Sequence, residues 1–164
     1  GKSMQELLAA SVELNVVDGV ILPNLKMQGT EEACAYLDEE GRCSIHPYRP
    51  GICRLFPLGR YYENGGFSYF LQTGECAKEN RSKIKVSKWI DTPDLTRNQQ
   101  FTLQWHDLLH AMEERLTGED EGKQREENLL LLRLFYLLPY EGTIDFYTQF
   151  TERMEHWNGQ NGQI

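Results

Sequence analysis

The chain has 164 residues, of which 40% are hydrophobic and 26% are charged, a composition typical of an ordinary globular protein. This length excludes a multidomain assembly, and the longest apolar stretch, residues 129–138, contains Arg133 and is too short to cross a bilayer. The net charge of -8 argues against general nucleic-acid binding, which depends on clustered lysine and arginine. We therefore expect no nucleic-acid partner and no membrane partner.

The charge is distributed unevenly along the chain. Residues 1–41 contain eight acids and two bases, residues 42–88 contain three acids and nine bases, and residues 89–164 contain fourteen acids and six bases. The basic middle segment also contains three of the four cysteines. A functional site is therefore expected in this part of the chain.

The first half of the chain carries signals for one short helix and two hairpins. Ser3 and Glu6 form a capping-box pattern, which predicts a short helix at the start of the chain. The turn residues at 18–19 lie between β-branched residues, and those at 64–66 lie between aromatic segments, so each predicts a β-hairpin. Frequent glycine and proline turns predict little helix between residues 30 and 90.

Beyond Trp89 the apolar residues recur at helical spacing. We expect Thr92 to cap a helix that continues to Gly118, a loop over residues 118–122, and further helices over residues 126–138 and 143–157. The predicted fold class is α+β. A small, irregular cysteine-bearing domain with short β-hairpins, residues 1–90, is followed by a helical extension of about three helices, residues 91–164, packed on it.

The four cysteines do not have the spacing of a known zinc finger, because no two of them form a CxxC pair. If residues 38–41 form a four-residue hairpin loop, Tyr36 faces Cys43 and Cys34 faces Ile45. Cys34 and Cys43 then lie diagonally on one face, roughly 7–8 Å apart. That separation exceeds the usual span of a disulfide, about 4.4–6.8 Å, but suits two thiolates that share a metal ion.

The segment between Arg42 and Arg60 contains four arginines and no acidic residue. Cations beside a thiolate site lower the pKa of the thiols and offset the negative charge of the bound centre. Three prolines stiffen the same segment, which reduces the entropy lost when ligands are fixed. This pattern favours a metal site. Two alternatives stay open: the cysteines are small buried hydrophobic residues, or they form disulfides, which a chain of this length does not need.

These residues resemble a known family. The segments that carry the resemblance are Cys34-Ala-Tyr-Leu37, Gly41-Arg-Cys43-Ser-Ile45, Arg49-Pro50, Cys53-Arg54-Leu-Phe56-Pro57 and Cys76. Together they resemble the YkgJ-like cysteine-cluster family, described as a zinc- or iron-chelating domain and often labelled Fe-S oxidoreductase. The resemblance covers about residues 12–80. Members of that family usually have an upstream CxxCxxCC cluster, so we expect that those cysteines were cut off or lost ahead of Gly1.

The resemblance implies a metal-binding protein whose ligands are Cys34, Cys43, Cys53 and Cys76, with cofactor contacts from Arg49 and Arg54. The implied cofactor is an iron-sulfur cluster or zinc, and the resemblance favours iron-sulfur. The redox form would exchange electrons with a protein partner in the cytoplasm of a bacterial cell. The alternative is a noncatalytic protein-interaction module with a structural zinc. The family label alone points to an enzyme, and no catalytic residue is indicated.

Three histidines are weaker candidates for metal ligands. His46 follows Cys43 by three residues and would complete a Cys3His site, or it is a turn histidine bonded to nearby backbone. His106 and His110 have the four-residue spacing of a helical metal pair. They fall at the edge of the water-facing side of the predicted helix, so a solvated helix is the favoured interpretation.

Overall fold

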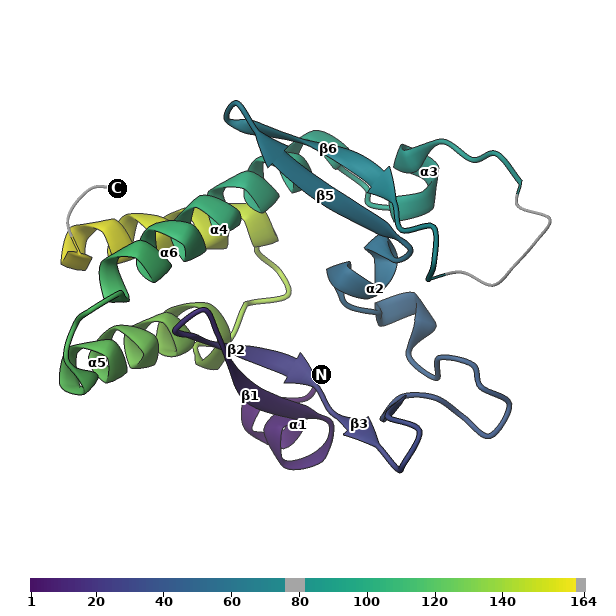
Figure 1. Ribbon diagram of the computed structural model, residues 1–164, viewed down its shortest axis with the longest axis horizontal. Helices are drawn as coiled ribbons and strands as arrows, with labels where there is room; N and C mark the ends of the chain where they lie inside the picture. The colour runs from purple at the N-terminus through teal and green to yellow at the C-terminus, as the bar shows by residue number, and fades with distance from the viewer. Residues whose placement is uncertain (76–81, 162–164) are drawn as a thin grey trace. The chain divides into compact units, whose positions relative to one another are not determined.

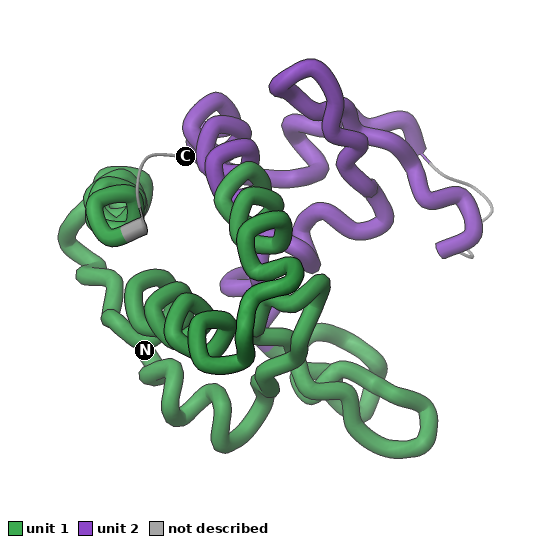
Figure 2. Tube along the Cα trace, turned by 60° about the vertical axis from the view of Figure 1, so that its left-hand side comes forward, with its two compact units in different colours: residues 1–44, 106–164 green, residues 45–105 purple. Residues whose placement is uncertain are grey.

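The computed structural model describes residues 1–75 and 82–161, and its fold is α+β as expected (Figure 1). The chain divides into two compact units, residues 1–44 with 106–164 and residues 45–105 (Figure 2). Helix α4 (Leu95–Leu116) contributes residues to both units. The expected division at residue 90 stays a prediction. None of the helices in the described residues is long and apolar enough to span a membrane.

Helix α1 (Met4–Ala10) begins with the predicted capping box. The Glu6 amide donates to the Ser3 hydroxyl over 3.3 Å, and the Ser3 amide donates to the Glu6 carboxylate over 2.7 Å. The hydrogen bond from the Ser3 backbone lowers the pKa of Glu6 because it stabilises the carboxylate. Two local side chains therefore satisfy the amides that the helix start leaves unpaired.

Strands β1 (Val12–Val17) and β2 (Val20–Leu25) form the first predicted hairpin. Asp18 and Gly19 both have positive φ, at 51° and 81°, which matches the two-residue turn that suits the twist of paired strands. After β2, the short strands β3 (Met27–Gln28) and β4 (Ala33–Cys34) pair with each other. The first unit thus contains two small antiparallel ladders near its amino terminus.

Asn128 on α5 (Glu121–Leu132) fastens the β1–β2 turn to the helices of the same unit. Its amide oxygen accepts from the Ile21 amide over 2.6 Å, and its amide nitrogen donates to the Gly19 carbonyl over 3.1 Å and to the Gln124 carbonyl over 2.9 Å. The side chain is 3% exposed. The buried side-chain amide of Asn128 therefore connects segments that lie more than one hundred residues apart in the sequence.

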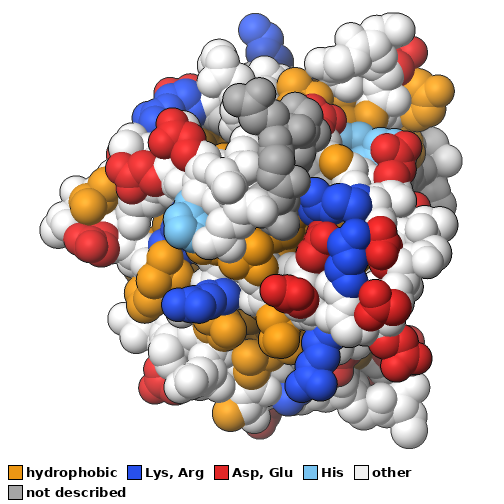
Figure 3. Space-filling model, turned by 90° about the vertical axis from the view of Figure 1, so that its left-hand side faces the viewer, with side chains coloured by type: hydrophobic (Ala, Val, Ile, Leu, Met, Phe, Trp, Pro, Cys, Tyr) orange, Lys and Arg blue, Asp and Glu red, His pale blue; other side chains and the backbone are white. Residues whose placement is uncertain are grey.

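The helical residues of the first unit enclose a core of large apolar side chains. The largest fully buried members are Trp157, Leu108, Met112 and Leu131. Between α4 and α5, Arg115 donates to Glu127 over 2.7 Å and lies over the Trp157 ring. On the face drawn in Figure 3, hydrophobic side chains gather between basic and acidic side chains. Some apolar surface on this face is thus bordered by charged side chains.

The helix predicted from about residue 143 begins at Phe146, and two other helix starts also differ from those predicted. Asp94, rather than Thr92, accepts from the Arg97 amide over 3.0 Å, and α4 begins at Leu95. Asp120 caps α5 by accepting from the amides at 122 and 123, so that helix begins five residues before the predicted start at Glu126. In both cases an aspartate accepts the amides of the first helical turn, as capping residues do.

The helix that contains α5 ends in a π-helical turn, η2 (Arg133–Leu137). The Leu138 amide donates to the Arg133 carbonyl over 2.9 Å, and Pro139 has no amide hydrogen, so the Leu134 carbonyl has no partner in its own helix. Arg153 on α6 (Phe146–Asn161) donates to the carbonyls of Leu134, Leu138 and Pro139 over 2.7, 2.9 and 2.8 Å. This arginine completes the hydrogen bonding of the helix end.

The second unit contains η1 (His46–Tyr48), α2 (Gly51–Leu55), strands β5 (Leu58–Glu63) and β6 (Gly66–Leu71), and α3 (Val86–Ile90). Strands β5 and β6 form the second predicted hairpin, with positive φ at Asn64 and Gly65. Gly59 lies opposite Phe70, and a Cβ there would be 2.3 Å from the phenyl ring. A glycine is therefore required beneath this ring. Helix over the described part of residues 30–90 is confined to these short segments, as predicted.

Candidate metal centre

The pairing of the first two cysteines differs from the predicted register. Cys43 forms an isolated bridge with Leu37, not with Tyr36, and Cys34 pairs with Met27. The pairing partner of Cys43 predicted from the sequence is therefore wrong by one residue. The second part of that prediction, in which Cys34 faces Ile45, is also wrong, because β4 pairs with β3.

The side chain of Asp38 explains the change in register. Its carboxylate accepts from the Glu40 amide over 3.0 Å and from the Arg42 amide over 2.8 Å, while its backbone amide donates to the Arg42 carbonyl over 2.9 Å. Arg42 therefore closes the loop with Asp38. A side chain that accepts backbone amides competes with the ladder and makes the loop longer than the turn residues alone indicate.

Cys34 and Cys43 are half-buried free thiols in the first unit. Near Cys34, the Ala35 amide donates to the Lys26 carbonyl over 3.1 Å, and beside Cys43 the Ser44 amide donates to the Tyr36 carbonyl over 2.8 Å. These backbone bonds hold both thiols on short, irregular segments. Partly exposed thiols on such segments are accessible to a metal ion.

Cys53 is exposed and lies on α2 in the second unit. The amides of Cys53 and Arg54 both donate to the Pro50 carbonyl, over 3.0 and 3.1 Å. The Arg54 guanidinium donates to the backbone carbonyls of Pro47 and Asp91 over 3.1 and 3.0 Å. It therefore holds the short helix with Cys53 against the segments on either side, and its charge lies one residue from the thiol.

Arg49 has an unsatisfied donor. One of its terminal nitrogens is hydrogen-bonded to Nε2 of His46, while its Nε is buried and has no hydrogen-bond partner. Buried guanidinium N–H groups are normally paired, and a thiolate or sulfide is an acceptor that would pair this one. This segment therefore combines thiols, which can ligate a metal, with a cationic N–H group that can donate to a ligand sulfur. These groups fit a thiolate-bound metal.

The sequence analysis did not predict the pair of His46 and Arg49. The two residues lie three positions apart across η1, a spacing that brings side chains together on a helical turn. The bond to Arg49 occupies Nε2 of His46. His46 is thus a turn histidine with a side-chain partner in this structure.

The other histidine pair lies on the surface of α4. The rings of His106 and His110 have centroids 6.2 Å apart, and His110 lies 3.6 Å from Glu113 and 3.7 Å from Glu114. Both imidazoles are substantially exposed. This agrees with the favoured interpretation of a solvated helix face.

The full ligand set stays a prediction. Cys76 lies outside the described residues, and the three described cysteines are divided between the two units. Over residues 1–75 and 82–161, no three side chains of histidine, cysteine, aspartate or glutamate are grouped so that they could hold a metal ion.

Comparison with known families gives a match over the part of the chain that contains Cys34, Cys43 and Cys53. Residues 3–73 match the CxxCxxCC family. Its model is described as a putative zinc- or iron-chelating domain, and the match confirms the resemblance to YkgJ-like proteins. The CxxCxxCC match includes these three cysteines and ends before Cys76 and the helices that follow. No curated protein and no solved structure matches the chain.

Proposed function

We propose that this protein binds zinc or iron through cysteine thiolates, with Cys34, Cys43, Cys53 and Cys76 as ligands. The observation that carries the proposal is the match of residues 3–73, which include three of these cysteines, to a family described as zinc- or iron-chelating. Thiolates are soft ligands that suit both zinc and iron-sulfur centres. Cys34 and Cys43 are half-buried free thiols and Cys53 is exposed, so all three can be reached by a metal.

Arg49 and Arg54 are proposed to stabilise the bound centre. The unsatisfied Nε–H of Arg49 would donate to a ligand sulfur, and the charge of Arg54 would offset the negative charge of the neighbouring Cys53 thiolate. No acidic residue occurs between residues 42 and 60, and the carboxylate that pairs with Arg54, that of Asp91, is exposed and lies 3.9 Å away. The guanidinium groups would thereby offset the negative charge of a thiolate-bound centre.

We further propose that the metal is iron in an iron-sulfur cluster. Such a cluster, when bound, supplies one-electron chemistry, and hydrogen bonds to its sulfurs tune its reduction potential. The protein would then exchange electrons with a partner protein in the cytoplasm, a compartment that keeps thiols reduced. Zinc in the same place would make the domain a noncatalytic interaction module.

Anaerobic purification of the full-length natural protein tests the identity of the metal. We expect visible charge-transfer absorption together with stoichiometric iron and sulfide. Colourless protein that contains one zinc would overturn the iron-sulfur proposal in favour of the zinc module. Protein that contains neither metal, and takes up neither when it is supplied to the reduced thiols, would overturn metal binding itself.

Single substitutions test the proposed ligands. Cys43→Ser and Cys53→Ser should each lower the metal content of the purified protein several-fold, because a hydroxyl is a far weaker ligand than a thiolate. Met27→Ser is the matched control, since it removes an exposed sulfur side chain that lies opposite Cys34. Metal content that is unchanged in both cysteine variants would show that these thiols are not ligands.

A further inference from the structure

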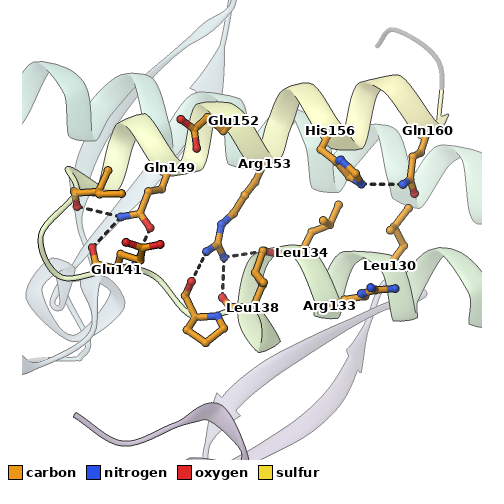
Figure 4. A pocket seen from close by; sticks show the side chains of 12 residues that line it. Leu130, Arg133, Leu134, Leu138, Glu141, Gln149, Glu152, Arg153, His156 and Gln160 are labelled. Carbon is orange, nitrogen blue, oxygen red and sulfur yellow. Dashed lines mark hydrogen bonds between the residues drawn. The ribbon is translucent and has the colours of Figure 1, made fainter.

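A pocket of about 640 Å³ lies between α6 and the helix formed by α5 and η2, within the first unit (Figure 4). Its volume falls in the range of small-molecule sites, about 300–1,000 Å³. Its lining includes Leu130, Arg133, Leu134, Arg153, His156 and Gln160. This pocket contains none of the cysteines and is separate from the proposed metal site.

Arg153 crosses the pocket and divides it. Its side chain starts on α6 and reaches the carbonyls of Leu134, Leu138 and Pro139 on the opposite wall (Figure 4). On one side of Arg153 lie Glu141 and Glu152, the two carboxylates of the lining (Figure 4). The two halves of the pocket therefore differ in charge.

The other half is basic. Arg133, His156 and Gln160 lie there, around the apolar side chain of Leu130 (Figure 4). Arg133 is exposed, and within the described residues it forms no ion pair. Two guanidinium groups thus border a space that contains no carboxylate.

The charge of Arg153 has only neutral partners in the described part of the chain. Three of its five N–H groups donate to carbonyls, and a side-chain hydrogen bond joins it to Tyr140, whose ring centre lies 3.5 Å from the guanidinium. The residue is 7% exposed. No described carboxylate forms an ion pair with it. Buried charges are usually paired, so a negatively charged group in the adjoining space would be stabilised.

His156 places an imidazole in this half of the pocket. Its Nε2 lies 2.7 Å from the side-chain amide nitrogen of Gln160. The π-helical turn η2 supplies Arg133 and Leu134 to the opposite wall. Single π-helical turns inside helices occur frequently at functional sites.

We propose that the basic half of this pocket binds a small organic anion that has a carboxylate on a short aliphatic chain. Arg133 and the N–H groups that Arg153 does not use on carbonyls would bind the carboxylate. Leu130 and Leu134 would contact the aliphatic part. The acidic half beyond Arg153 would repel a second negative charge, which favours monoanions over longer dianions.

Titration with hexanoate tests this proposal, using the full chain and amide chemical shifts as the readout. We expect saturable shifts at Leu130, Arg133 and residues of α6 from Arg153 onward. Hexylamine, which has the same chain and the opposite charge, should cause none there. Hexylamine shifts equal to those of hexanoate, or no saturable shift with hexanoate at millimolar concentration, would overturn the proposal.

A charge-removing variant provides the second arm of the test. Arg133→Gln should weaken hexanoate binding about tenfold, because it removes a charge-assisted hydrogen bond from an exposed side chain without disturbing the core. Arg125→Gln is the matched control, since Arg125 is exposed on the same helix and does not line the pocket. Equal weakening in both variants would mean that net charge alone attracts the anion, and would contradict the proposed site.

Discussion

Arg153 is the residue on which the end of the π-helical turn most depends. Replacing it by Met would leave the carbonyls of Leu134, Leu138 and Pro139 without their donor. The bond to Leu134 is buried and the other two are part-buried, so the carbonyls would lose a partner and keep much of their desolvation cost. We therefore expect Arg153→Met to lower the free energy of unfolding by about 2–4 kcal/mol. Urea denaturation measures this change.

The control for that experiment is Arg125→Met, which removes an exposed arginine from α5. Surface substitutions usually change stability by less than about 0.5 kcal/mol. If Arg153→Met is as mild as this control, the three carbonyls must find other partners, and the role given to Arg153 is wrong.

Tyr136 makes the stability sensitive to alkaline pH. Burial raises its pKa to about 12, above the ordinary value of 10.0 that applies in the unfolded chain. The folded protein therefore holds the phenol proton more tightly, and this contribution is complete below pH 10.0 and is lost as the pH rises toward about 12. In Tyr136→Phe, we expect the free energy of unfolding to fall less steeply above pH 10 than in the unmodified protein. Urea denaturation over this pH range measures it.

An exposed tyrosine supplies the comparison for the alkaline experiment. Tyr48 is 85% exposed, so Tyr48→Phe should leave the alkaline loss of stability as steep as in the unmodified protein. A profile for Tyr136→Phe that coincides with that of Tyr48→Phe would show that burial does not hold the Tyr136 proton.

At the scale of elements, Asn128 joins the β1–β2 hairpin to α5. Asn128→Ala would leave the Ile21 amide and the Gly19 carbonyl without this partner. We expect a loss of about 1–3 kcal/mol in unfolding free energy and faster hydrogen exchange at the hairpin amides. Asn15→Ala, on the exposed part of β1, is the control and should cause neither effect. Unchanged exchange in Asn128→Ala would show that other contacts fasten the hairpin.

Elements fixed by neighbouring residues could be predicted from the sequence. The capping box at Ser3 and Glu6 and the turns at Asp18-Gly19 and Asn64-Gly65 act over a few positions, and the structure has each of them where the pattern indicates. The start of α5 could not be predicted as well. Asp120 lies in an acidic tract typical of a loop, and its capping bonds add a turn of helix there.

Features fixed by side chains reaching across the chain were not predictable. The pairing of Cys43 depends on the two amides that Asp38 accepts, and this choice is invisible in the spacing of the cysteines. Arg153 and Asn128 give no local signal either, because their partners are remote in the sequence. That the candidate site would contain thiols could be predicted from its residues. Whether four sulfurs come together could not, because it depends on the tertiary structure.

At the scale of the whole molecule, the proposed metal links distant parts of the chain. A metal that binds the folded state and not the unfolded chain raises stability, by about 2.7 kcal/mol at a hundredfold excess over its dissociation constant. We expect chelation of the purified protein to lower its unfolding temperature. Resupply of the same metal to the reduced protein, with sulfide where the metal is iron, should restore it. Calorimetry before and after chelation measures the change. Equal unfolding temperatures before and after chelation would contradict a metal that stabilises the folded protein.

X-ray absorption spectroscopy at the zinc or iron edge of the anaerobically purified full-length protein tests the central proposal most directly. We predict a first shell dominated by sulfur at about 2.3 Å, the distance of thiolate ligands. This shell should lose sulfur in Cys43→Ser and keep it in Met27→Ser. A first shell of nitrogen and oxygen alone, at about 2.0–2.2 Å, would contradict thiolate ligation.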